Sequence, residues 1–102
     1  ISVKLSLAKS LIEINDKKSL KKSQLILEQL IPMKYNSIYF WKLIGMNAKK
    51  LGDKPASLVA LAEEKILKKQ YDKAKIFASK ALKYKNIKTL YKIRASDIIN
   101  FK

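Results

Sequence analysis

Two adjacent carboxylates, Glu63 and Glu64, are the only acidic pair in the sequence and the first place to look for acid–base or metal chemistry. Neighbouring side chains on a helix point about 100° apart, so these carboxylates do not readily share a proton or a metal ion. Glu64 has Lys68 one turn further on, at the spacing of a weak surface ion pair, whereas Glu63 has Ile66 and Leu67 there. We therefore expect a solvated helix face and no acidic site.

The sequence contains no histidine and no cysteine. This composition excludes thiol chemistry, disulfides and the commonest zinc ligands. Serine and lysine are plentiful, but a Ser–Lys nucleophile pair needs a lysine desolvated in a cleft, and no segment indicates one. We predict that this chain has no catalytic residues, no metal site and no cofactor.

Arg94 is the only arginine among 23 basic residues, and the net charge is +15. Such a charge suggests nucleic acid, but proteins that recognise specific bases usually depend on arginine. Lysine here accompanies abundant isoleucine and asparagine, as in AT-rich genomes, so we interpret the charge as compositional. A small basic helical domain that binds nucleic acid stays open as the alternative. For Arg94 itself we expect an ion pair, with Asp97 at i+3 or with a neighbouring helix.

The lysine-rich stretch Lys17-Lys18 with Lys21-Lys22 is interpreted as a solvated face, and binding to an anionic membrane surface is the less favoured interpretation. No apolar run approaches the ~20 residues that cross a bilayer, and no signal-peptide pattern begins the chain. The length allows one domain, which we place over residues 1–102. Because the chain begins at Ile1 and not at Met, we expect a C-terminal fragment of a larger protein.

Six segments have apolar residues at helical spacing, and we place them at 2–14, 17–30, 37–50, 55–68, 71–84 and 87–100. Asp16 and Asn36-Ser37 are predicted N-caps, and Pro32 is predicted to end the second helix. Gly52 suits the left-handed position after a helix, and Pro55 suits the first turn of the next. Such short links between helices require antiparallel neighbours.

Large and small residues recur in a fixed order along these helices. Trp41, Gly45 and Gly52-Asp53 form one set, and Tyr71-Asp72, Ala74 and Ala81-Leu82 form a second. Together they resemble the tetratricopeptide repeat, a helix pair of about 34 residues. The two registers differ by half a repeat, so the helix over 55–68 would pair with both of its neighbours. Gly45 is at a small-residue position, and we expect it to pack against a neighbouring helix with no room for a side chain.

The resemblance implies an all-α fold, with antiparallel helix pairs in a right-handed superhelical array of about six helices. It also implies a protein–protein interaction module that binds through a concave face. In this family five positions of the first helix usually point into that face, and here they are Tyr39, Lys42, Met46, Lys49 and Lys50. Three lysines beside a tyrosine and a methionine would suit a protein or an acidic peptide with apolar anchors.

A narrower resemblance covers roughly residues 24–99. It is carried by the runs 35–45, 61–64, 70–74, 80–82 and 94–98. These runs are similar to the C-terminal tail of bacterial periplasmic zinc metalloproteases, which join an H-E-x-x-H catalytic domain to tetratricopeptide repeats and are associated with quality control of outer-membrane proteins. A chain without histidine cannot contain that motif. The resemblance implies a non-catalytic tail, periplasmic or membrane-associated, that binds substrates, partners or its own protease domain.

Overall fold

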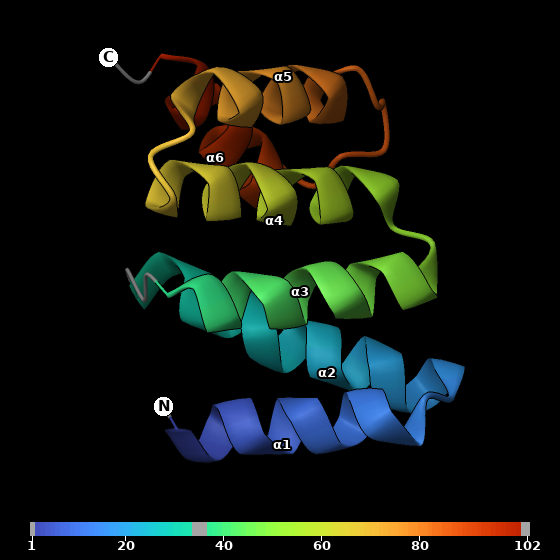
Figure 1. Cartoon of the computed structure of the whole chain (residues 1–102). Helices are drawn as coiled ribbons and strands as arrows, with labels where there is room; N and C mark the ends of the chain where they lie inside the picture. Colours follow the sequence, from blue (N-terminus) through green and yellow to red (C-terminus); the bar gives the residue numbers. More distant parts are fainter. Residues whose placement is uncertain (1, 34–36, 101–102) are drawn as a thin grey trace.

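The structure is a computed structural model that describes residues 2–33 and 37–100. These ranges form α1 (Ser2–Ile14), α2 (Lys17–Leu30), the short 3-10 helix η1 (Ile31–Met33), α3 (Ile38–Leu51), α4 (Lys54–Leu67), α5 (Tyr71–Leu82) and α6 (Thr89–Ile99). They contain six α-helices and no strand, which confirms the all-α prediction. Consecutive helices run back and forth across the molecule, with α1 at one end and α5 at the other (Figure 1).

Capping side chains fix where α2 and α3 begin. The Asp16 carboxylate accepts a hydrogen bond from the backbone N–H of Ser19 at 2.7 Å. The Ser37 hydroxyl accepts one from the N–H of Phe40 at 3.0 Å. Each bond satisfies an N–H that the first helical turn leaves without a partner. Asp16 and Ser37 are both predicted caps, and Asn36, the other predicted capping residue, lies outside the described residues.

The turn between α3 and α4 also follows the sequence-based expectation. Gly52 has a φ of 75°, the left-handed conformation that ends α3. The Asp53 side chain accepts from the N–H of Ala56 at 3.2 Å and so caps α4. Pro55 lies in the first turn of α4, where its missing N–H has no effect on the helix. This two-residue link makes α3 and α4 antiparallel neighbours (Figure 1).

The fourth helix lies at the centre of the array. It packs along α3 on one side and α5 on the other, and it also contacts α6, which lies behind α4 and α5 in Figure 1. At the other end, α1 packs against α2 and α3. Within the described ranges the backbones of α3 and α5 do not come close to each other, because α4 separates them. The helix that the two predicted repeat registers share thus contacts three other helices, as α3 also does.

Buried apolar side chains from all six helices form one continuous core. The large members include Leu5 and Ile12, Leu27 and Leu30, Phe40 and Trp41, Val59, and Tyr91 and Ile98. The buried positions of α5 are alanines, namely Ala74, Ala78 and Ala81. Small residues allow neighbouring helices to approach closely. The predicted small-residue positions 74 and 81 are thus at a helix–helix contact.

Gly45 lies beside α4, but with more space than predicted. A Cβ atom added at Gly45 would meet the Cβ of Ala60 at 3.5 Å, which is an ordinary van der Waals contact. The prediction that no side chain fits is therefore wrong for a methyl group. The reason is that the facing residue, Ala60, is itself small.

Candidate peptide-binding groove

A groove of about 320 Å³ runs along the surface between α3 and α4. Its lining residues are Lys42, Gly45, Met46 and Lys49 of α3 and Ser57, Leu61 and Glu64 of α4. On α3 these residues follow at i, i+3, i+4 and i+7, and on α4 at i, i+4 and i+7, so on each helix they share one face. Gly45 has no side chain, which keeps the middle of the groove open.

A second hollow of about 370 Å³ continues this groove toward the α3–α4 turn. It is lined by Lys49, Gly52, Lys54, Ser57, Leu58 and Tyr84. Lys49 and Ser57 line both hollows, so the two form one extended depression, which we call the α3–α4 groove. Its far end reaches Tyr84, which follows α5.

The lining combines apolar surface with positive charge. Met46 is half exposed, and Leu58, Leu61 and Tyr84 are partly exposed, so apolar atoms are accessible to a ligand. The charged residues in the lining are three lysines, Lys42, Lys49 and Lys54, and one carboxylate, Glu64. An extended segment with alternating acidic and apolar side chains would complement both features.

The structure separates the five predicted groove residues. Lys42, Met46 and Lys49 line the α3–α4 groove. Tyr39 is exposed on α3 but is not among the lining residues. Lys50 lines a different hollow, on the side of α1 and α2, together with Lys17 and other residues. Consecutive helical residues point about 100° apart, so Lys49 and Lys50 do not share one groove.

The contribution of α4 was not predicted from the sequence. Ser57, Leu61 and Glu64 follow helical spacing, and that pattern was available in the sequence as a second outward face. The resemblance implies a groove lined by first helices only, so it does not point to these residues. Tyr84 lies in a link between helices, where no periodicity indicates which way a side chain points.

A partly buried ion pair joins α4 to α6. The Nε of Arg94 donates to a carboxylate oxygen of Glu63 at 2.7 Å, and a second guanidinium nitrogen donates to the same oxygen. Glu63 is 6% exposed, so the prediction of a solvated face is wrong for this residue. Burial raises the pKa of Glu63, and the charge of Arg94 opposes this shift. For Arg94 the predicted pairing with a neighbouring helix is confirmed.

Two further contacts join α6 and the residue before it to α3 and α2. The Arg94 guanidinium lies 5.2 Å from the centre of the Trp41 ring, a cation–π contact with α3. The Lys88 Nζ forms an ion pair with Glu28 of α2 at 3.1 Å. Tyr91 is buried on the same helix, and burial together with the negative charge of Glu28 raises its pKa. Arg94 of α6 therefore contacts both α3 and α4, the two helices that form the α3–α4 groove.

Comparisons of the chain with protein-family models, with curated proteins and with solved structures found no match. Across residues 2–33 and 37–100, no helix is both long enough and apolar enough to span a membrane. The same residues contain no group of acidic side chains arranged to hold a metal ion. We take the α3–α4 groove as the candidate site because two adjoining hollows form it and three of the five predicted residues, Lys42, Met46 and Lys49, line it.

Proposed function

We propose that this chain is a protein-binding module of tetratricopeptide type, and that the α3–α4 groove takes an acidic peptide with apolar anchors. The observation that carries the proposal is the lining of this groove. It places Lys42, Lys49 and Lys54 around Met46, Leu58, Leu61 and Tyr84. Carboxylates of a bound peptide would pair with the lysines while its apolar side chains cover the floor.

The shape of the site supports a peptide over a small molecule. The depression continues from Lys42 at one end to Tyr84 at the other, and both hollows are open to solvent along their length. Small-molecule sites are usually concave enough to enclose most of the ligand. Helical-repeat modules instead bind through extended surfaces where several modest contacts share the free energy of binding.

The test uses a synthetic peptide of alternating glutamate and leucine, with a glutamine counterpart as the uncharged probe. Fluorescence anisotropy would compare the double variant Lys42→Glu/Lys49→Glu with the double variant Lys17→Glu/Lys50→Glu. The control pair lines the hollow beside α1 and α2, away from the groove. Both variants change net charge equally, so long-range steering alone predicts equal losses.

We expect the groove pair to weaken binding about tenfold or more and the control pair to weaken it no more than about threefold. Leu61→Ser changes no charge. It should weaken binding of both peptides because it removes apolar surface that the leucines of the peptide would cover. Equal losses for the two charge variants, with no effect of Leu61→Ser, would contradict the assignment of the groove.

The resemblance of residues 24–99 to the tail of bacterial zinc metalloproteases supports a more specific proposal. In this proposal the groove belongs to the non-catalytic tail of such an enzyme and holds a substrate, a partner or the protease domain itself. The encoding gene offers a direct test, because the proposal requires an H-E-x-x-H domain in the same open reading frame. An open reading frame without that domain removes the metalloprotease from the proposal and leaves the groove unaffected.

A further inference from the structure

Exposed apolar side chains gather on the first two helices. Val3, Leu7 and Ile14 of α1 are 79%, 49% and 60% exposed. Their spacing of four and seven residues places them on one face of α1. Leu5, Ala8 and Ile12 of the same helix are buried, so this exposed stripe lies opposite the core. A folded helix therefore presents a second apolar face to solvent.

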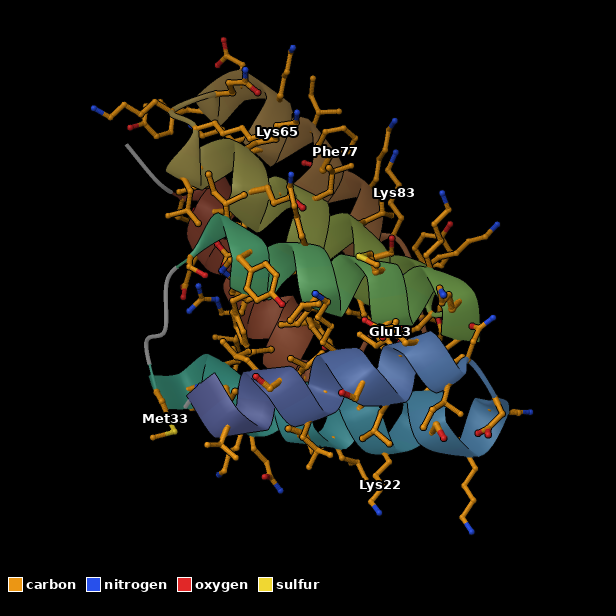
Figure 2. All side chains as sticks on the ribbon, turned by 60° about the horizontal axis from the view of Figure 1, so that its bottom comes forward. Glu13, Lys22, Met33, Lys65, Phe77 and Lys83 are labelled. Atoms are coloured by element: carbon orange, nitrogen blue, oxygen red, sulfur yellow. The ribbon has the colours of Figure 1, made fainter. Side chains whose placement is uncertain are left out.

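The outer face of α2 adds positive charge to this end of the molecule. Lys18, Lys21, Lys22 and Leu25 follow at i, i+3, i+4 and i+7, so they share one face. All four are exposed, and Leu25 is 62% exposed among the lysines. Figure 2 shows Lys22 pointing away from the body on the edge that α1 and α2 form, far from Lys83 near the other end. Because α1 and α2 pack against each other, the two outward stripes lie on adjacent helices. We call these four residues, together with Val3, Leu7 and Ile14, the α1–α2 face.

Charge decides which occupant suits the α1–α2 face. A second copy of this chain would bring its own lysines and a net charge of +15 against the same residues, which is repulsive. A partner must instead be anionic and must also accept isolated apolar side chains that project from a convex helix surface. A lipid surface meets both requirements without shape complementarity, because it is fluid. Lysine side chains can reach the headgroup phosphates while leucine, valine and isoleucine enter the acyl boundary.

We propose that the α1–α2 face binds the surface of an anionic membrane. Binding there leaves the α3–α4 groove free, because the two surfaces share no residue. The lysines supply electrostatic attraction and the apolar stripe supplies shallow insertion, without any segment that spans the bilayer.

Flotation of the full chain with vesicles tests this proposal. One set of vesicles contains phosphatidylcholine alone and the other contains phosphatidylcholine mixed with phosphatidylglycerol. The charge variant is Lys18→Gln/Lys21→Gln/Lys22→Gln, and its matched control is Lys83→Gln/Lys85→Gln/Lys92→Gln, which removes three exposed lysines elsewhere. The apolar variant is Leu7→Ser/Leu25→Ser, and its control is Ile76→Ser/Ile93→Ser on α5 and α6, where both isoleucines are exposed.

The wild-type chain should float with the anionic vesicles only. Each lysine near such a surface contributes about fivefold to partitioning, so the α2 triple variant should lose up to about a hundredfold and its control far less. High salt weakens the attraction between the lysines and the anionic lipids. Under that condition the wild type should still bind the vesicles, whereas Leu7→Ser/Leu25→Ser should not.

Other outcomes would overturn the proposal. Equal losses for the two lysine triplets would mean adsorption by net charge alone. Binding of poly-glutamate that depends on the same residues would identify an acidic protein partner instead. A wild-type dimer in sedimentation velocity that Leu7→Ser/Leu25→Ser dissociates would identify a second copy as the occupant. Absence of the wild type from the floated anionic vesicles would reject the proposal directly.

Discussion

Arg94 of α6 lies over the ring of Trp41 of α3, with 5.2 Å between the guanidinium carbon and the ring centre. The same guanidinium donates two hydrogen bonds to the buried carboxylate of Glu63 on α4. One side chain of the last helix therefore contacts both walls of the α3–α4 groove. Its loss should affect the stability of the fold and the alignment of the groove together.

Arg94→Ala should leave the Glu63 carboxylate buried without a partner. Removing one member of a buried pair destabilises by several kcal/mol, and because the Arg94 side chain is partly exposed we expect about 2–3 kcal/mol. Urea denaturation of both proteins measures the change. The double variant Arg94→Met/Glu63→Leu should recover most of the loss. A double variant no more stable than Arg94→Ala would show that packing of Arg94, and not its charge, is what matters.

The free energy of unfolding should depend on pH in part through the titration of Glu63. Its pKa is raised above the ordinary value of 4.5 by burial, so the folded state holds this proton to a higher pH than the unfolded state does. The contribution of this group to stability is then fully present below that value and is lost as pH rises through the raised pKa. Relative to Glu63→Gln, the wild type should become less stable over this window. A wild type that gains stability relative to Glu63→Gln would mean that attraction to Arg94 outweighs burial.

Gly45→Ala should stabilise the protein. The new methyl group meets only an ordinary contact with Ala60, and replacing glycine within a helix gains about 0.5–1 kcal/mol from backbone entropy. A thermal melt measures the gain. A lower melting temperature would mean that α3 and α4 are closer together than the 3.5 Å contact indicates.

Asn47 and Ser23 are both buried polar residues, but they differ in their hydrogen bonds. No atom in the described part of the chain hydrogen-bonds to the side-chain amide of Asn47, whereas the Ser23 hydroxyl donates to the Ala8 carbonyl at 3.1 Å. Asn47→Leu should therefore raise the unfolding free energy by about 1–2 kcal/mol, since it removes unsatisfied groups, and Ser23→Ala should lower it by about 1 kcal/mol. Denaturant melts would reveal the opposite signs. Loss of stability in Asn47→Leu would indicate that a bound water satisfies the amide.

Binding to duplex DNA should be weak and indifferent to sequence. Lysines dispersed over a folded surface contact phosphates without reading bases, so the affinity should fall steeply with salt. Gel-shift titrations at two salt concentrations, with two unrelated duplexes, measure this. Tight binding of one duplex at physiological salt would favour the nucleic-acid alternative over a peptide-binding groove.

Local signals explain which elements could be predicted from the sequence. Asp16, Ser37 and Gly52 act through bonds to residues three or four positions away, so helix limits near them were predictable. Glu63 was misplaced because its partner Arg94 is 31 residues away, and no local pattern indicates that α6 packs beside it. The same limit applies to Tyr84, whose place at the end of the groove depends on how α5 packs on α4.

The ion pair between Glu28 of α2 and Lys88, the residue just before α6, joins two positions 60 residues apart in the sequence. In an open solenoid each unit contacts only its neighbours, and unfolding can begin at either end and spread. Here α6 packs on α5 and α4, and Arg94 of α6 also contacts Trp41 of α3 and Glu63 of α4. The last helix therefore contacts more than its neighbour in sequence, which distinguishes this array from an open solenoid. Because α6 cannot detach without breaking its contacts with α3, α4 and α5, we expect these four helices to unfold in one cooperative transition.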